Sequence, residues 1–112
     1  MALRRLKRRP EFLQVASSGQ KAAMPGLVLQ ARDRSDDDDV RVGFTASKKV
    51  GGAVERNRAK RRLREVFRHQ QHQVPAGFDL LLIARAAATS RPLAELEAQF
   101  SEACQRLQPP PA

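Results

Sequence analysis

Three successive segments between residues 40 and 85 constrain the fold more than any other feature of this chain. Val40 to Ala46 alternates in a way that gives a strand one apolar face. Residues 53–71 are strongly helical, and Phe78 to Arg85 is a mainly apolar run of the length of a buried strand. A strand, a helix and a second strand in this order predict a parallel crossover whose second strand lies near the centre of the sheet.

Glycine and proline delimit the elements that precede this unit. A proline begins a predicted helix over 10–18, and Gly19 ends it as a C-terminal capping glycine. A strand follows at 27–31. We expect it to form an antiparallel hairpin with 40–46, joined by the acidic tip at 33–39.

The last predicted helix covers 92–107 and has one apolar stripe for the core. Prolines cannot continue that helix, so residues 108–112 are expected to form a flexible tail. These elements predict an α/β (α+β) two-layer sandwich with a mixed four-stranded sheet and three helices. With 112 residues the chain is long enough for one such core, and we expect a single domain over 1–112 that begins with a basic arm at 1–8.

Positive charge is concentrated in two parts of the chain. There are 21 Lys and Arg against 12 Asp and Glu, and the net charge is +9. Residues 48–68 hold nine of the basic residues, and residues 1–9, the N-terminal arm and the residue after it, hold five: Arg4, Arg5, Lys7, Arg8 and Arg9. Either cluster alone is also typical of a solvated surface. Together with acidic groups at 36–39 and near the C-terminus, they indicate a molecule that orients itself on a nucleic-acid backbone.

Membrane, disulfide and metal-binding classes are disfavoured. The longest apolar run, Leu80 to Ala84, is far shorter than the roughly 20 residues of a membrane span, and no signal sequence is recognised. A single cysteine, Cys104, excludes an intrachain disulfide framework and is typical of a cytoplasmic protein. His69, His72 and Cys104 offer no fourth zinc ligand, and the acidic run at 36–39 is more typical of a solvated turn. We therefore expect no metal site in the protein and no membrane partner.

Residues for protein catalysis do not stand out in the sequence. A nuclease needs groups that activate water and protonate the leaving oxygen. The sequence shows no Ser/His/Asp or Cys/His pattern of suitable spacing and no paired carboxylates beside the basic helix. We expect the protein to contribute no catalytic residue.

The predicted helix at 53–71 separates apolar from basic side chains. One stripe is apolar and consists of Ala59, Leu63, Val66 and Phe67. The polar faces carry Arg56, Asn57, Lys60, Arg61, Arg64 and Arg68. Like charges at i, i+4 destabilise an isolated helix by about 0.2–0.5 kcal/mol per pair, and a phosphate backbone supplies the missing counter-charge. Lys48, Lys49 and a Gly-Gly pair precede the helix, where backbone amides form a candidate anion site.

The segment from Ser47 to Glu65 resembles the signature of the bacterial ribonuclease P protein component. Arg56-Asn57-Arg58 matches the Arg-Asn-Arg motif of that family, and the basic residues after it follow in register. The resemblance extends over nearly the whole chain and includes Arg5-Leu6-Lys7, Phe12, Arg41-Val42-Gly43 and the strand at 80–85.

This resemblance implies the protein subunit of a ribonucleoprotein that removes 5′ leaders from precursor tRNA. The catalyst in that family is RNA with bound magnesium ions, so the implied partners are the catalytic RNA and precursor tRNA, without DNA and without a cofactor of the protein's own. The implied contacts to the catalytic RNA are Lys48, Lys49, Arg56, Asn57, Arg58, Lys60, Arg61, Arg64 and Arg68. A cleft between the first helix and the sheet holds the leader, and its implied residues are Phe12, Ala16, Gln30 and Phe44. The resemblance also implies a left-handed crossover at 40–85, whereas crossovers in general are right-handed.

The predicted cleft departs from the family pattern at Ala16 and Gln30, where the family frequently has aromatic residues. Phe12 is then the main stacking platform, with Phe44 and electrostatic attraction as further contributions. Two other classes stay open on the residues alone. One is a basic ribosomal or ribosome-associated protein, and the other is a DNA-binding module, which is disfavoured because the basic helix flanks a sheet instead of following a helix–turn–helix.

Overall fold

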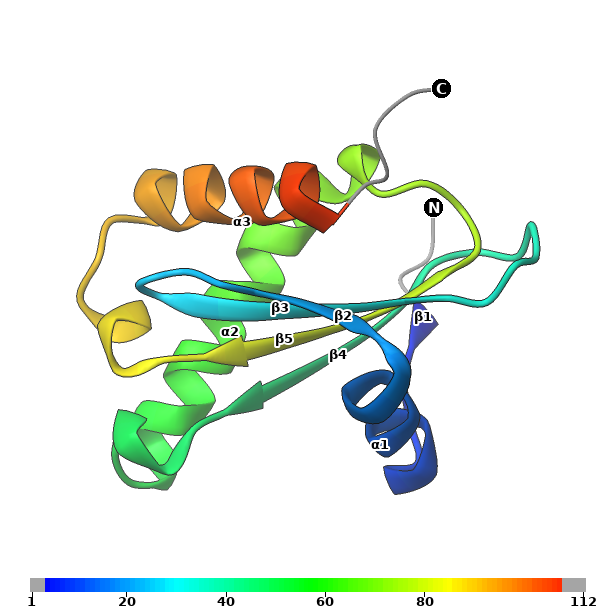
Figure 1. Cartoon of the computed structure of the whole chain (residues 1–112). Helices are drawn as coiled ribbons and strands as arrows, with labels where there is room; N and C mark the ends of the chain where they lie inside the picture. Colours follow the sequence, from blue (N-terminus) through cyan, green and yellow to red (C-terminus); the bar gives the residue numbers. More distant parts are fainter. Residues whose placement is uncertain (1–3, 108–112) are drawn as a thin grey trace.

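The structure of the protein is a computed structural model that describes residues 4–107. The first residues of the predicted arm and the predicted tail at 108–112 lie outside the described residues. The elements follow in chain order as β1 (Arg4–Arg5), α1 (Arg9–Ser18), β2 (Gln20–Ala23), β3 (Leu27–Asp33), β4 (Arg41–Ala46), α2 (Ala53–Gln70), β5 (Phe78–Ala84) and α3 (Leu93–Leu107) (Figure 1). Short 3₁₀ turns at Lys48–Val50, Gln71–Gln73 and Ala86–Thr89 connect them.

The strands form one mixed sheet in the order β1-β4-β5-β3-β2. β4 and β5 are parallel neighbours joined through α2, and β3 is antiparallel to both β5 and β2. This arrangement confirms the mixed four-stranded sheet, the parallel crossover and the central position of β5. The two-residue strand β1 is added at the edge of β4.

The predicted hairpin between the strands at 27–31 and 40–46 is wrong. β3 and β4 do not pair with each other. Each pairs with β5, which lies between them in the sheet. The acidic segment therefore crosses over the start of β5, where the Arg34 N–H bonds the Gly77 carbonyl and the Gly77 N–H bonds the Asp38 carbonyl, both at 2.8 Å. Gly77 has a φ of 90°, and a Cβ there would overlap the carbonyl oxygen of Asp36.

Gly19 ends α1 as predicted, but its backbone is extended and not left-handed, with φ −86° and ψ 166°. Its N–H still caps the helix by bonding the Val15 carbonyl at 2.9 Å. A glycine is needed because of close packing, since a Cβ would lie 2.6 Å from the carbonyl oxygens of both Ala31 and Val15.

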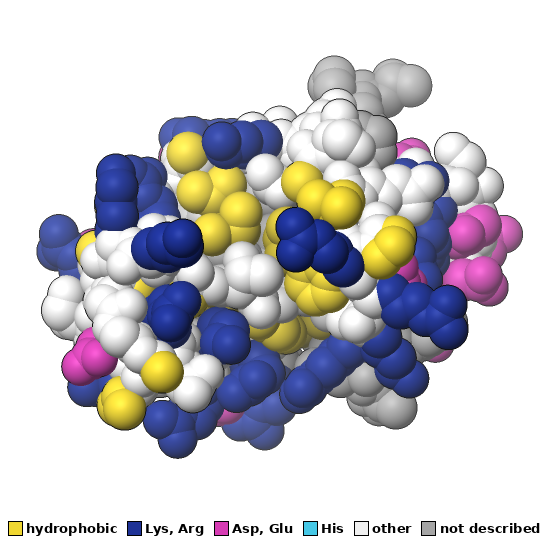
Figure 2. All heavy atoms as spheres, turned by 90° about the horizontal axis from the view of Figure 1, so that it is seen from below, with side chains coloured by type: hydrophobic (Ala, Val, Ile, Leu, Met, Phe, Trp, Pro, Cys, Tyr) yellow, Lys and Arg dark blue, Asp and Glu magenta, His cyan; other side chains and the backbone are white. Residues whose placement is uncertain are grey.

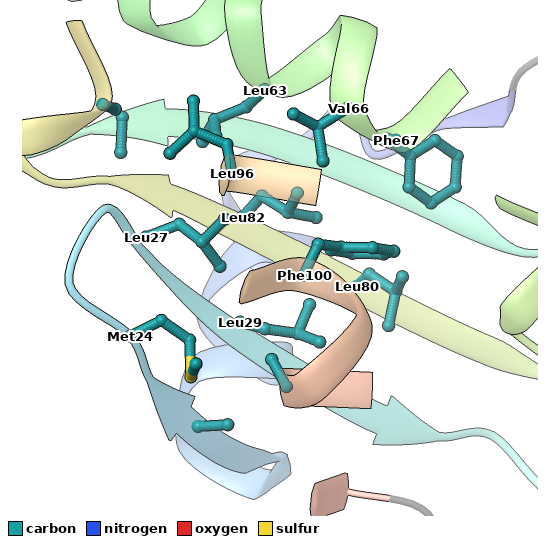
Figure 3. Packing of buried hydrophobic residues seen from close by; sticks show 14 of the residues in the cluster. Met24, Leu27, Leu29, Leu63, Val66, Phe67, Leu80, Leu82, Leu96 and Phe100 are labelled. Atoms are coloured by element: carbon teal, nitrogen blue, oxygen red, sulfur yellow. The ribbon is translucent and has the colours of Figure 1, made fainter. Parts of the chain in front are cut away.

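The helices cover the two faces of the sheet unequally (Figure 1). α2 and α3 enclose the main core with one face, to which they contribute Leu63, Val66, Phe67, Leu96 and Phe100 (Figure 3). The apolar stripe predicted for α2 is confirmed, because all four of its residues are buried. The other face carries α1 and a small cluster of Leu6, Val15 and Leu81. Over residues 4–107, no helix combines the length and apolar character that a membrane crossing requires.

Candidate nucleic-acid interface

α2 directs its cations away from the core because its apolar stripe is buried. Arg58, Arg61 and Arg68 are exposed, and Arg56, Lys60 and Arg64 are partly buried. Among the described residues, only Arg68 of these six has an ion pair, with Glu65. The Nε atom of Arg56 is buried and has no hydrogen-bond partner in the described part of the chain. The face therefore offers cations that the protein itself does not neutralise.

Arg62 differs from the other arginines of this helix. Its Nε donates to the carbonyl oxygen of Ala88 at 2.9 Å, and its guanidinium also binds the carbonyl of Arg91. These hydrogen bonds tie α2 to the segment before α3, so the cation serves the fold.

Lys48 and Lys49 are exposed on the short turn that leads into α2. The turn is fixed by Ser47, whose hydroxyl accepts a hydrogen bond from the Lys49 N–H at 3.1 Å. Gly51 then takes a φ of 137°, which an L side chain rarely adopts. Both lysines thus lie at the N-terminal end of α2, where the helix dipole favours anions.

A groove of about 370 Å³ runs between β4 and α2. Its lining residues are Phe44, Thr45, Ala46, Ala53, Arg56, Asn57 and Lys60. β1 pairs only with Arg41 and Val42, so the rest of β4 forms the edge of the sheet beside this groove. The groove brings an aromatic ring, an open strand edge and three polar residues of α2 together.

Two of the predicted cleft residues, Phe12 and Gln30, lie on the α1 side of the sheet. Phe12 lies directly over Gly43, where a Cβ would be 2.5 Å from the ring atom Cε1. Gln30 lies opposite Leu81 in the sheet register, and Leu81 packs in the same small cluster as Phe12. The Oε1 atom of Gln30 is buried and has no partner among residues 4–107. Ala16 is exposed on α1.

Phe44 does not share that cleft, which corrects the expected grouping. Its ring packs edge-on against Phe67 of α2, with the ring centroids 6.2 Å apart, and it belongs to the core on the opposite face. The alternation along β4 explains the separation, because Phe44 and Gly43 must point to opposite sides of the sheet. Phe44 lies instead in the groove beside α2.

Part of the predicted N-terminal arm belongs to the sheet. The backbone of Arg4 and Arg5 pairs with β4, and Leu6 is buried. Arg5, Lys7, Arg8 and Arg9 are exposed. Figure 2 views the side on which α1 lies, and shows hydrophobic side chains in its middle, Lys and Arg around them, and most of the visible Asp and Glu at one end.

An ion-pair network beneath α1 was not expected from the sequence. Asp79, with 1% of its side chain exposed, binds Arg34 and Arg41, and Arg41 also binds Glu11 of α1. Burial alone would raise the pKa of the Asp79 carboxyl, but the hydrogen bonds from Arg41 and Arg34 outweigh it and hold that pKa below its ordinary value. The pKa of Glu11 is also lowered, chiefly by hydrogen bonds from the backbone of Arg8 and Lys7. The signal in the sequence was a charged residue inside an otherwise apolar strand.

The residues considered as metal ligands have other surroundings. His69 lies between two carboxylates, with Nδ1 2.6 Å from Glu97 and Nε2 3.2 Å from Glu65. Cys104 is buried, and burial raises the pKa of its thiol to about 11. Within residues 4–107, no group of three or more His, Cys, Asp or Glu is placed to hold a metal ion.

Comparison with known proteins supplies relatives of this arrangement. The family model described as Ribonuclease P matches residues 2–108. The ribonuclease P protein component of Gluconacetobacter diazotrophicus is 55% identical over 93 residues, which cover 82% of this chain and 80% of that protein. The corresponding protein of Paramagnetospirillum magneticum is 46% identical over 110 residues, covering 94% and 83%.

Solved structures agree with these sequence matches. The RNase P protein from Thermotoga maritima superposes with a TM-score of 0.79 at 27% identity, covering 94% of this chain and 98% of that one. The Staphylococcus aureus RNase P protein gives a TM-score of 0.77 at 27% identity, covering 94% and 95%. Sequence and fold point the same way over almost the full length, and the chain belongs to the bacterial ribonuclease P protein component family, the protein subunit of a ribonucleoprotein endoribonuclease that processes tRNA.

Proposed function

We propose that this subunit binds the catalytic RNA of ribonuclease P through α2 and holds the 5′ leader of precursor tRNA on the side of the sheet that carries α1. The observation that carries the proposal is the unneutralised basic face of α2. Arg58 and Arg61 are exposed there without an ion pair among the described residues, next to the groove that contains Arg56, Asn57 and Lys60. Guanidinium groups bind phosphate oxygens with paired hydrogen bonds, and an amide such as Asn57 is suited to a base edge or a ribose hydroxyl.

Leader binding is supported by a second surface, separate from the first. Phe12 lies on the opposite face of the sheet from the main core, and exposed cations of the N-terminal segment, Lys7 and Arg8, come shortly before it in the chain. An unpaired nucleotide can stack its base on such a ring while its phosphate is attracted by nearby cations. The two surfaces let one small subunit touch the catalytic RNA and its substrate at the same time.

The chemistry in this proposal belongs to the RNA subunit and to magnesium ions that it binds. The protein supplies positive charge close to phosphates, which replaces counterions that two RNA molecules would otherwise need in order to approach. Cleavage with the protein present should therefore require less magnesium than cleavage by the RNA alone. A cytoplasmic location, where tRNA precursors are made, is part of the same proposal.

Reconstitution tests this function. The catalytic RNA of a related bacterium is combined with the purified chain at a magnesium concentration too low for the RNA alone, and removal of the leader from precursor tRNA is measured. We expect cleavage to be restored at the mature 5′ end. A chain that binds ribosomal RNA and leaves leader cleavage unchanged would instead be the ribosomal or ribosome-associated protein considered above.

A further inference from the structure

Two ion pairs in series link α1 to the centre of the sheet. Arg41 of β4 binds the buried Asp79 of β5 with two hydrogen bonds, from Nε to Oδ1 at 2.8 Å and from Nη2 to Oδ2 at 2.7 Å. The remaining nitrogen, Nη1, donates to Oε2 of Glu11 at 2.7 Å. Oε1 of Glu11 accepts the backbone N–H groups of Lys7 at 2.9 Å and Arg8 at 2.8 Å. The first turn of α1 is thus bound to a buried carboxylate through one guanidinium.

The same strand also provides the seat of the aromatic ring of α1. Phe12 directly follows Glu11, and its ring lies over Gly43, two residues after Arg41. A Cβ at Gly43 would lie 2.5 Å from Cε1 and 2.9 Å from Cζ of that ring. Alternate residues of a strand share a face, so Arg41 and Gly43 both face α1. Arg41 binds Glu11 through an ion pair, and Gly43 leaves room for the ring of Phe12. A shift of the first turn of α1 would lift the ring from this seat.

We propose that Arg41, held in place by Asp79, is a positioning residue that sets the place of the Phe12 ring and thereby the affinity for unpaired leader nucleotides. The inference rests on the proposed function, in which Phe12 stacks on the leader. Stacking needs a ring held in a defined plane by its supporting residues. The rigid fork of an arginine can bind two carboxylates in fixed directions, which a lysine ammonium does not do.

Asp79 still has other cations beside it when Arg41 is replaced. The effect of the replacement on Phe12 can therefore be distinguished from the cost of leaving a buried carboxylate unpaired. Arg34 binds Asp79 directly, and Nη1 of Arg32 lies 3.7 Å from its Oδ2. Arg32 is a matched control for Arg41: both side chains are 27% exposed and both face Asp79, but Arg32 has no ion pair with α1 among the described residues.

The test uses holoenzyme reconstituted with wild-type protein or with Arg41→Met, Arg32→Met, Phe12→Ala or the double variant Phe12→Ala/Arg41→Met. Calcium replaces magnesium to block turnover, and the Kd values for precursor tRNA and for mature tRNA are measured. We expect Arg41→Met to weaken precursor binding roughly fivefold, the lower end of the range for one stacked base, with mature tRNA and the Arg32→Met variant unchanged. The double variant should bind precursor no more weakly than Phe12→Ala alone, because Arg41 acts through the ring. Arg41→Lys, which keeps a charge beside Asp79, should behave like Arg41→Met and serves if the methionine variant does not fold.

Several results would overturn the proposal. Additive losses in the double variant would mean that Arg41 contacts RNA itself, and equal losses for both tRNA forms would mean a general defect of the fold. Unchanged precursor binding by Arg41→Met, with a loss in Phe12→Ala, would reject positioning and leave the leader function intact. If Phe12→Ala binds both tRNA forms normally, the leader function fails, and the inference about Arg41 fails with it.

Discussion

Arg62 donates a hydrogen bond from Nε to the carbonyl oxygen of Ala88 at 2.9 Å, while its neighbour Arg61 points to solvent. Two adjacent arginines of one basic helix therefore have different tasks. The first holds α2 against the segment before α3, and the second is free to meet a phosphate.

Replacing these neighbours one at a time separates stability from binding. Arg62→Ala should lower the free energy of unfolding by about 1.5–3 kcal/mol, because the carbonyls it binds lose a charged donor. Arg61→Ala should leave unfolding unchanged and weaken binding to the catalytic RNA. Thermal or urea unfolding and an RNA-binding titration of both variants check this, and equal effects on unfolding would contradict it.

Replacing Arg56, Arg58 and Arg61 together with alanine should weaken binding to the catalytic RNA without unfolding the protein. Each lost phosphate contact should also flatten the slope of log K against log salt by roughly 0.7–0.9. The control is Arg106→Ala on α3, an arginine paired with Glu102 far along the chain from this face. A triple variant with a normal salt slope would show that α2 is not the contact surface.

Asp79→Asn should lower the free energy of unfolding at neutral pH by about 1.5–3 kcal/mol, since Arg41 and Arg34 lose a charged acceptor although they keep Glu11 and Asp36 as partners. The pKa of Asp79 is lower in the folded than in the unfolded protein. Its stabilising effect is therefore complete above the unfolded value of about 3.9 and disappears as the pH falls through the folded value. Unfolding free energies measured between pH 7 and pH 2 should thus depend less on pH in the variant than in the wild type.

The control for that experiment is Asp37→Asn, which changes an exposed carboxylate of the acidic loop. Its unfolding free energy at neutral pH should match that of the wild type. A variant at Asp79 that is as stable as this control would mean that the network contributes nothing to the folded state.

Phe12→Ala should weaken binding of precursor tRNA with a leader of several nucleotides by about 1–3 kcal/mol, the value of one lost stacking platform. Mature tRNA has no leader, so its affinity should barely change, and assembly with the catalytic RNA through α2 should persist. Parallel loss for both tRNA forms would identify Phe12 as a core residue, and no loss for either would leave charge alone to hold the leader.

Purified protein without the RNA subunit should cleave no precursor tRNA at any magnesium concentration. The sequence shows no paired carboxylates beside the basic helix. Within residues 4–107, no group of three or more His, Cys, Asp or Glu is placed to hold a metal ion that would activate water on a phosphodiester. Incubation of RNA-free protein with labelled precursor tRNA over a magnesium series is the measurement, and specific cleavage at the mature 5′ end would contradict the prediction.

Local patterns in the sequence predicted the elements with a strong period. The buried stripe of α2 and the central strand β5 follow directly from apolar spacing, because regularly spaced apolar residues are buried together when the element packs into the core. β2 consists of the residues Gln-Lys-Ala-Ala, which show no strand pattern in the sequence. This segment is a strand because it pairs with β3. The pairing of β3 with β5 was missed because a short polar segment between two strands favours a hairpin, and the competition from β5 is a property of the whole sheet.

The site was predictable where one helix carries it and less so where several segments meet. Arg58 and Arg61 are three residues apart on one helix, so spacing alone placed them near each other. The cluster around Asp79 joins residues from α1, β3, β4 and β5, and only the register of the sheet brings them together. The same register explains Phe44, since a one-residue step along β4 moves a side chain to the other side of the sheet.

The central place of β5 has a consequence for how a growing chain acquires its shape on the ribosome. β5 is the last strand to be synthesised and the one that joins β3 to β4. Before residues 78–84 emerge, the nascent chain can pair only β1 with β4 and β2 with β3, two fragments without a shared core. Contacts this distant in sequence form slowly. The basic segment at 48–68 is therefore exposed to surrounding RNA before the hydrophobic core has formed. An RNA that binds it at this stage binds a chain whose sheet is still incomplete.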